Sequence, residues 1–267
     1  MLPWKGFRRP AIVRLCVLAS GSSGNCTLVA TASTRLLIDA GLSAREIERR
    51  LNAAGERLDQ VDAILITHEH TDHIAGLPTL SRKLRRPVFL TELTASTLRW
   101  DAEPPPIERF QAGARWQIGD IEVASFSLPH DAVDPVGFRF ETQGLKIAVV
   151  TDLGYIPDSI RFHVRGSDVL VLESNHDLEM LKVGPYPWFV KQRVMGRHGH
   201  LSNDAVARFI RRDLDPATDT LILGHLSEHN NHPDLARLVA RQALESRGFR
   251  TRLLVIEHGR QSEVIQL

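Results

Sequence analysis

The chain has 267 residues, of which 43% are hydrophobic and 24% charged. These values are typical of a globular protein and exclude extensive disorder, and we expect one domain spanning residues 1–267. With 33 basic and 32 acidic side chains the net charge is only +1, so bulk charge gives no argument for a polyanionic partner.

The cysteines and the apolar runs indicate the redox state of the thiols and the compartment of the protein. Cys16 and Cys26 are too few for a disulfide framework, and both lie in or beside apolar runs that favour buried free thiols. The apolar run after Arg14 is too short for a secretory signal, and no run approaches the roughly 20 apolar residues of a membrane span. We therefore expect a cytoplasmic protein.

In chain order, the first half opens with strands and then alternates helices with strands. A helix of about three turns is predicted from Ser43, because Ser43 and Glu46 form a capping box and apolar residues follow at helical spacing up to Gly55. Strands are predicted at residues 12–18, 27–30, 35–39, 61–66 and 88–90, and further helices at 77–84 and 91–100.

The second half repeats this character, with strands predicted at residues 121–128, 136–141, 146–150 and 169–172. Two sheets, each with helices on its outer side, are the simplest packing of elements distributed in this way. Periodicity alone indicates only a mixture of α and β.

The predicted strand at 61–66 stops abruptly in the run Thr67-His68-Glu69-His70-Thr71-Asp72-His73. Neutral imidazoles and a carboxylate are ligands for divalent metals. They serve two ions if the loop turns so that Asp72 and His73 face away from His68 and His70. A lone histidine is most often a satisfied polar residue, but four ligand-type side chains in H-x-H-x-D-H order predict a metal site.

Three more ligand-type residues follow later strands, namely His130, Asp152 and His225. Strand ends collect in one cleft, so we expect these side chains near the 67–73 loop. Taken singly, Asp152 is equally explained as a helix cap and His225 as a core residue.

The 67–73 run, with these later strand ends, resembles the signature of the metallo-β-lactamase-fold hydrolases. The resemblance implies an α+β fold, the four-layer αββα sandwich, and two divalent ions (zinc, manganese or iron). It implies that one ion is held by His68, His70 and His130, the other by Asp72, His73 and His225, that Asp152 bridges both, and that Asp39 orients a ligand histidine from behind.

Finer matches favour one branch of this family. The stretches 18–25, 173–177, 184–187, 199–203 and 225–231 resemble the YycJ branch, also called WalJ or VicX. This implies a 5′-to-3′ exonuclease acting on DNA through a hydroxide that bridges the metals, without the inserted β-CASP domain of larger nucleases. Asp72 then helps to hold the nucleophile in line, and His200 protonates the leaving oxygen. A purely structural histidine at a helix start is the alternative for His200.

Several residues are candidates for binding nucleic acid, which we expect as the partner and specifically as single-stranded DNA. Ser22 and Asn25 lie in a Gly/Ser-rich loop suited to anions, although a plain hairpin turn explains that loop equally well. His229, Asn230 and Asn231 follow the last ligand and can bind phosphate oxygens or simply form a loop.

Two basic segments have the same two explanations, nucleic-acid contact or a solvated helix. The first is a cluster of Arg82, Lys83, Arg85 and Arg86. The second is residues 180–200, where lysines and arginines alternate with Tyr186, Trp188 and Phe189, a mixture suited to phosphate charge and base stacking. A small-molecule hydrolase and a non-catalytic regulatory domain are the rival functions.

Overall fold

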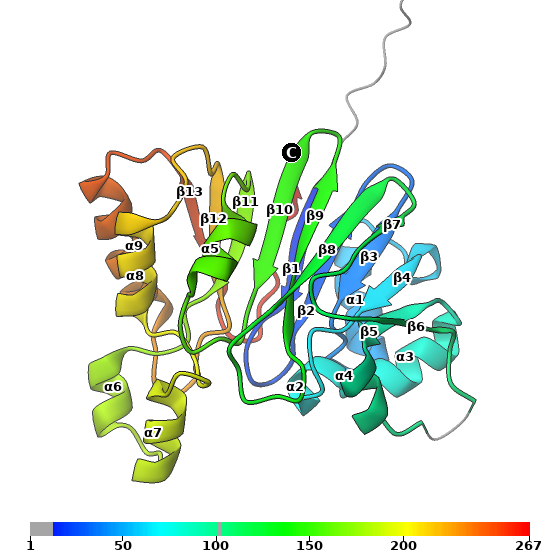
Figure 1. Ribbon diagram of the computed structural model, residues 1–267, viewed down its shortest axis with the longest axis horizontal. Coiled ribbons are helices and arrows are strands. Elements are labelled where there is room, and N and C mark those ends of the chain that lie inside the picture. Colours follow the sequence, from blue (N-terminus) through cyan, green and yellow to red (C-terminus); the bar gives the residue numbers. More distant parts are fainter. Residues whose placement is uncertain (1–12, 101–102) are drawn as a thin grey trace, which may run out of the picture.

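Two seven-stranded sheets pack face to face, and helices cover the outer side of each (Figure 1). This computed structural model describes residues 13–100 and 103–267. The four-layer αββα arrangement expected from the family resemblance is confirmed.

The first sheet has the strand order β14-β1-β2-β3-β4-β5-β6, and β3 to β6 are parallel. Its strands are β1 (Arg14–Ala19), β2 (Cys26–Ala30), β3 (Arg35–Ile38), β4 (Ala63–Leu65), β5 (Val88–Thr91), β6 (Ile107–Phe110) and β14 (Ile265–Gln266).

The second sheet has the order β13-β12-β11-β10-β9-β8-β7, and β10 to β13 are parallel. Its strands are β7 (Arg115–Ile118), β8 (Ile121–Ser127), β9 (Val136–Thr142), β10 (Leu145–Val150), β11 (Val169–Glu173), β12 (Thr220–Gly224) and β13 (Arg252–Val255).

The helices cover both sheets and one end of the molecule (Figure 1). The first sheet is covered by helices α1 (Ala44–Ala53), α3 (Leu77–Leu84) and α4 (Glu92–Thr97). The second sheet is covered by helices α5 (Asp158–Val164), α8 (Asn203–Arg212) and α9 (Pro233–Ser246). The short α2 (Thr71–Ile74) lies in the histidine-rich loop. The pair α6 (Leu178–Val183) and α7 (Trp188–Met195) projects beyond the end of the sheets at which α2 lies. A 3₁₀ turn, η1 (Leu58–Gln60), precedes β4.

The predicted strands are present with ends shifted by one or two residues, and Ile12 lies outside the described residues. The helix predicted at 91–100 is too long, because Leu98 adopts an extended backbone that ends α4. Strands β6 and β7 were not predicted: both lie at sheet edges, are half exposed, and carry charged side chains that hide the apolar pattern.

Only half of the predicted capping box forms. The Ser43 hydroxyl accepts a hydrogen bond from the Glu46 N–H at 3.3 Å, but the Glu46 carboxylate binds Arg49 and Arg50. Arg50 also donates to the Leu18 carbonyl at 2.6 Å, so it attaches α1 to β1.

One apolar cluster lies between the two sheets, where large side chains such as Phe138 and Phe140 are fully buried, and two more lie between the sheets and their helices. Burial of each such side chain stabilises the fold by about 1.5–3 kcal/mol. This packing aligns the parallel strands of both sheets, so their carboxyl ends meet at one edge of the molecule. Cys16 and Cys26 are buried and free, as predicted.

Among the described residues, every helix is too short or too polar to cross a lipid bilayer.

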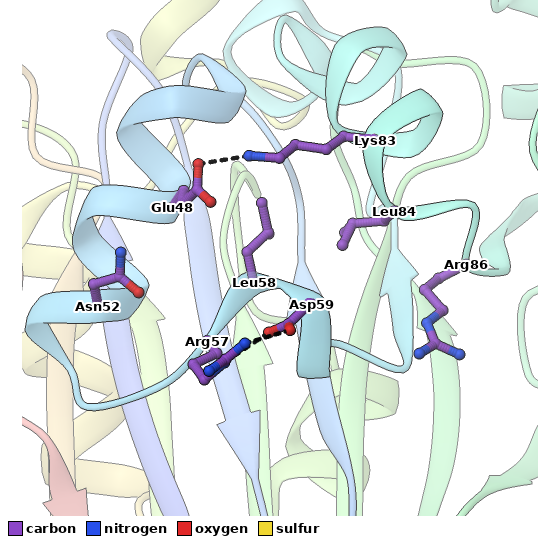
Figure 2. Close-up of a pocket in the computed structure, with 8 residues that line it drawn as sticks. All are labelled: Glu48, Asn52, Arg57, Leu58, Asp59, Lys83, Leu84 and Arg86. Atoms are coloured by element: carbon purple, nitrogen blue, oxygen red, sulfur yellow. Dashed lines mark hydrogen bonds and ion pairs between the residues drawn. The ribbon is translucent and has the colours of Figure 1, made fainter.

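The first basic segment lies away from that edge. Lys83 and Arg86 line a surface pocket between α1, η1 and α3 (Figure 2), which lies near the amino-terminal ends of β4 and β5. Lys83 pairs with Glu48 at 2.7 Å, and in the same pocket Arg57 pairs with Asp59. The histidine-rich loop follows the carboxyl end of β4, so this cluster does not lead to it.

Candidate metal centre

The structure brings together all seven residues expected to bind metal. Four lie in the loop after β4, and three follow the ends of β8, β10 and β12. Their ligand atoms form overlapping groups in which all atoms lie within 4.8 Å of one another: His68, His70 and His130; Asp72, His73 and His225; and His68, His73 and Asp152.

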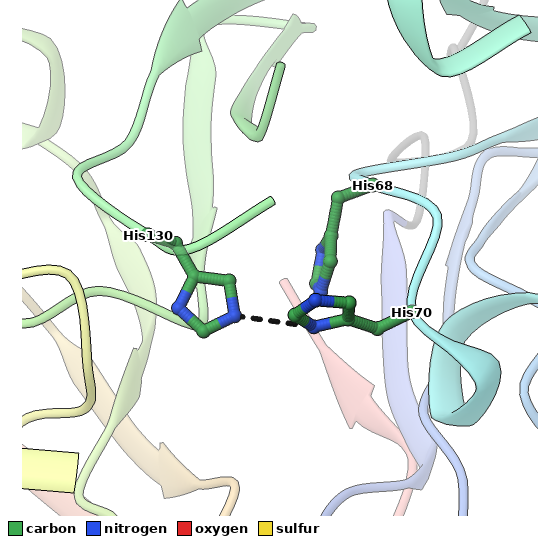
Figure 3. A group of neighbouring side chains, drawn as sticks. All are labelled: His68, His70 and His130. Carbon is green, nitrogen blue, oxygen red and sulfur yellow. Dashed lines mark hydrogen bonds between the residues drawn. The ribbon is translucent and has the colours of Figure 1, made fainter. Parts of the chain in front are cut away.

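The first group consists of three imidazoles that point toward one another (Figure 3). The Nε2 atom of His130 lies 3.3 Å from Nδ1 of His70, and the His68 ring centre is 4.6 Å from that of His70. Burial lowers the pKa of His68 and of His130, so both rings are neutral near pH 7. Nε2 of His68 is buried without a hydrogen-bond partner among the described residues. A neutral, unpaired nitrogen in this position fits a metal ligand.

The second group combines two imidazoles with a carboxylate. Oδ2 of Asp72 lies 3.4 Å from Nε2 of His225 and 3.5 Å from Nε2 of His73. Asp152 lies between the two groups: one carboxylate oxygen is 3.2 Å from Nε2 of His73, and the other is 3.9 Å from Nε2 of His130. The spacing fits a carboxylate shared by two cation positions.

The remote ring nitrogen of four histidines is held by a hydrogen bond. The acceptor or partner is Thr67 Oγ1 for His68 (3.0 Å), Asp39 Oδ2 for His73 (2.8 Å), the Gly199 carbonyl for His130 (3.1 Å) and Glu173 Oε1 for His225 (2.9 Å). In each case Nδ1 makes this bond and Nε2 faces the centre. Such bonds orient ligand rings and raise their basicity.

Asp39 has the position expected for it. Its carboxylate binds Nδ1 of His73 and also accepts hydrogen bonds from the Thr67 N–H at 2.8 Å and the Thr67 hydroxyl. One buried carboxylate therefore holds both the start of the metal loop and one of its ring nitrogens.

Glu173, at the end of β11, is a site residue that the sequence reasoning missed. It is fully buried, and its Oε1 accepts from Nδ1 of His200 at 2.7 Å and from Nδ1 of His225. Oε2 accepts from the backbone N–H groups of Leu153 and Leu201, each at 3.1 Å. Its place directly after the apolar run 169–172 was the available signal, because the other site residues also follow strands.

The charges around Glu173 set its protonation state. Burial by itself raises the pKa of this carboxyl, but the charge of His200 and the hydrogen bonds from His200 and His225 outweigh burial and lower it to about 2. In turn, burial opposes protonation of His200, but the Glu173 carboxylate raises the pKa of that ring. Glu173 is therefore an anion that favours a protonated His200.

His200 lies over the centre, where its ligand atom groups with those of Asp152, Glu173 and His225 and with neither set of three described above. Its ring centre is 5.1 Å from that of His130 and 5.3 Å from that of His225, and its side chain is 23% exposed. Because Nδ1 donates to Glu173, Nε2 is the nitrogen that is left to meet a substrate.

In the metal-free protein, protons occupy part of this centre. Burial opposes a charge on His225, but Asp152, Asp72 and Glu173 raise its pKa to about 10. Burial likewise opposes a charge on His73, which Asp39 and Asp152 overcome, so its pKa also lies well above the usual range. A divalent cation can replace these two positive charges, so the residues fit a metal.

Three site residues adopt left-handed backbone conformations at strand ends. The φ angles are 63° for Asp39, 65° for Asp152 and 54° for His225. Such conformations cost about 1–3 kcal/mol each for residues other than glycine and cluster at functional sites. They turn the chain sharply, so each side chain faces the centre directly after its strand.

Asn25, Asn230 and Asn231 are buried in this structure, and as substrate contacts they stay predictions. The buried Asn25 amide lies 3.1 Å from Asp72 Oδ2 and 3.0 Å from His73 Nε2, so it positions the metal loop. The buried Asn231 amide donates to the backbone carbonyl oxygens of Ser174 and Asn175, and Asn230 is also buried.

Ser22 and His229 are exposed, and they stay predictions as substrate contacts. Glu69, which had no assigned role, accepts a hydrogen bond from the Val133 N–H at 2.8 Å and so fixes the loop that carries His130.

Comparison with known proteins agrees with this geometry. A beta-lactamase superfamily domain matches residues 34–225. The exodeoxyribonuclease YycJ of Bacillus anthracis is 40% identical over 236 residues, which cover 87% of this chain and 89% of the relative. The exodeoxyribonuclease WalJ of Streptococcus pneumoniae is 39% identical over 229 residues, covering 83% and 84%.

A solved structure has the same fold. The metallo-beta-lactamase fold protein YhfI from Bacillus subtilis superimposes with a TM-score of 0.72 at 16% identity, covering 94% of this chain and 99% of that one. From the matched domain and the clustered ligand residues, we conclude that this chain belongs to the metallo-β-lactamase superfamily of metal-binding hydrolases.

Proposed function

We propose that this protein is a metal-dependent nuclease, a 5′-to-3′ exonuclease that acts on single-stranded DNA in the cytoplasm as one domain. The observation that carries the proposal is the His200–Glu173 pair beside the centre, which supports His200 as the proton donor to a departing oxygen. The identity of about 40% with relatives named exodeoxyribonucleases, over most of the chain, supports DNA as the substrate. The two free, buried cysteines support a reducing compartment.

We assign His68, His70 and His130 to one cation, Asp72, His73 and His225 to a second, and Asp152 to both. Two divalent ions (zinc, manganese or iron) supply, when bound, an activated water and positive charge for a phosphate. The donor set of five imidazoles and two carboxylates is suited to all three metals.

The chain's own residues orient the attacking water and protonate the leaving oxygen. Asp72 is partly exposed while Asp152 is buried, so Asp72 is the carboxylate that reaches the solvent side of the centre and aligns the attacking water. His200 donates its Nε2 proton to the sugar oxygen that leaves the phosphorus. Glu173 holds Nδ1 of His200, so the ring keeps its orientation through the transfer.

Substrate class and polarity are tested with one panel. Single- and double-stranded DNA and RNA, labelled at the 5′ or 3′ end, and a thioester are incubated with the purified protein and Zn²⁺ or Mn²⁺. We expect nucleotides to be released from the 5′ end of single-stranded DNA. Thioester hydrolysis without nucleotide release would overturn the proposal and favour a small-molecule hydrolase.

Roles within the site are tested by three substitutions. His68→Ala and Asp152→Ala should abolish hydrolysis together with normal metal content. His200→Ala should lower turnover by about 10²-fold or more while the metal content measured by atomic emission stays that of the wild type. A His200→Ala protein that loses metal would contradict the proton-donor role.

A further inference from the structure

The α6–α7 pair presents an exposed apolar surface beside the metal centre. Val183 is 85% exposed, Trp188 63% and Phe189 72%. These side chains are therefore not packed in the core. We call Val183, Trp188 and Phe189 the platform.

The platform is connected to the site at both ends of its segment. Its helices form the segment between Glu173 and His200, so both ends of the segment are site residues. At the end of α7, the Val194 carbonyl accepts from the His200 N–H at 2.9 Å, and the Gly199 carbonyl holds His130. Figure 1 shows α6 and α7 extending outward from the end of the sheets at which α2 lies.

Internal bonds keep the two helices together. Lys191 is buried, and its ammonium donates to the Lys182 carbonyl at 2.7 Å, so α7 is tied to α6. Lys191 is therefore not available to a phosphate. Arg193 pairs with Asp131, the neighbour of His130, so α7 is also tied to the loop of a metal ligand.

We propose that the platform is a base-stacking site for single-stranded nucleic acid, whose strand continues from it into the metal centre. This rests on the proposed function. Flat aromatic side chains that are exposed to solvent stack with bases whatever the sequence. A duplex hides its base faces within the helix, so a single strand is the form that fits.

The local charge supports a polyanionic occupant. Residues 178–198 contain four basic side chains and one acidic side chain, in a chain whose total net charge is only +1. Lys182 pairs with Glu179, Arg193 pairs with Asp131 and Lys191 is buried, so the accessible part of this excess is the charge of Arg197. Arg197, which stacks over Tyr155 at 4.5 Å, adds an exposed guanidinium at the end of α7 nearest His200. A strand that stacks on Trp188 therefore meets positive charge on its way to the metals.

A second copy of this chain is the competing occupant. In a two-fold dimer the same surface faces itself, so the excess positive charge of residues 178–198 would be placed opposite an identical excess. Like charges in contact oppose association, whereas a phosphate backbone neutralises them. Charge therefore favours the nucleic acid.

The test is binding of a fluorescein-labelled oligothymidylate, measured by anisotropy with a chelator present so that hydrolysis does not interfere. Trp188→Ala combined with Phe189→Ala should raise the Kd by about tenfold or more. Phe162→Ala is the matched control, because Phe162 is 70% exposed but lies on α5, and it should bind as the wild type does.

A second variant separates stacking from general apolar contact. Trp188→Phe keeps an aromatic face and should bind more tightly than Trp188→Leu, which keeps apolar area alone. Because these side chains are exposed, the melting temperature should stay unchanged in all variants. With metal restored, the double variant should show a raised KM for single-stranded DNA.

Several results would overturn the inference: equal Kd values for wild type and double variant, equal affinity for single-stranded and duplex DNA, or equal binding by the Phe and Leu variants. A wild-type dimer that becomes a monomer in the double variant, with unchanged DNA affinity, would assign the platform to a second copy. Binding through the platform without nucleotide release with either metal would contradict the proposed function alone. Hydrolysis with an unchanged Kd would contradict this inference alone.

Discussion

Replacement of Glu173 by glutamine is the sharpest perturbation that the site allows, because the shape is kept and only the charge and two acceptors change. In the wild type, one oxygen accepts from two backbone N–H groups, which cannot change, and the other accepts from Nδ1 of His200 and of His225. The glutamine oxygen must therefore face the backbone pair, and its NH₂ group must face the two imidazoles.

This orientation reverses the direction of the hydrogen bond that residue 173 makes with each imidazole. Nδ1 of each ring must then accept a hydrogen bond, so each protonated ring gives up its Nδ1 proton and keeps the one on Nε2. For His225 the remaining proton is on the nitrogen that faces Asp72 and the metal position. For His200 the change leaves a neutral ring that lacks its counter-charge and is a weaker acid.

The magnitudes follow from the bonds that change. All four hydrogen bonds lose the charge of the carboxylate, at up to about 1 kcal/mol each, so we expect a loss of about 2–4 kcal/mol in the free energy of unfolding. Metal affinity should fall by about 10–100-fold, as for other lost orienting partners, and turnover by about 10²-fold or more.

Three measurements check this: urea unfolding of the metal-free protein, metal titration, and turnover at saturating metal. Glu122→Gln, at a partly exposed site on β8, is the control and should change none of them. Wild-type metal affinity and turnover in Glu173→Gln would refute the assignment of Glu173 as the residue that orients both rings.

Three further predictions follow from the geometry of the loop and the charges of its histidines. A Cβ at Gly41 would lie 1.7 Å from the Asp72 carbonyl oxygen, so Gly41→Ala should lower the free energy of unfolding by about 2 kcal/mol or more and weaken metal binding, as chemical denaturation and metal titration will show. Because the pKa of His225 is raised to about 10, metal binding near pH 7 should release protons and should weaken as the pH falls. Calorimetry in buffers of different ionisation enthalpy measures the proton release, and a binding heat that does not depend on the buffer would contradict it. The same raised pKa stabilises the metal-free fold while the ring stays protonated, so its free energy of unfolding should decrease as the pH rises from 6.5 toward about 10, and a flat pH profile would contradict this.

Local spacing was enough to predict much of the fold and of the metal centre. The run from His68 to His73 lies within a single turn after a buried strand, so its ligand character does not depend on distant partners. The later strand ends at His130, Asp152 and His225 were predicted to meet it because strand patterning and the family resemblance agree on a sandwich. The edge strands β6 and β7 escaped prediction because partial exposure removes the apolar pattern on which it relies.

The tertiary structure decided the roles that depend on contacts between distant segments. Glu173 meets Nδ1 of His225 across 52 residues of sequence because β11 and β12 are parallel neighbours. The buried Asn25 amide meets the Asp72 carboxylate, 47 residues away, because the fold brings the loop after β1 to the loop after β4.

The tertiary structure also decided which side chains of residues 180–200 are exposed. The composition of residues 180–200 is the same whether Trp188 is buried or exposed, and only the packing of α6 and α7 shows that it is exposed while Lys191 is buried. The sequence by itself determined which residues are able to hold a metal, because ligand chemistry belongs to the side chain and its near neighbours. Only the folded chain decided which side chains orient the ligands and which face solvent, because burial and hydrogen-bond partners are set by the order and direction of the strands.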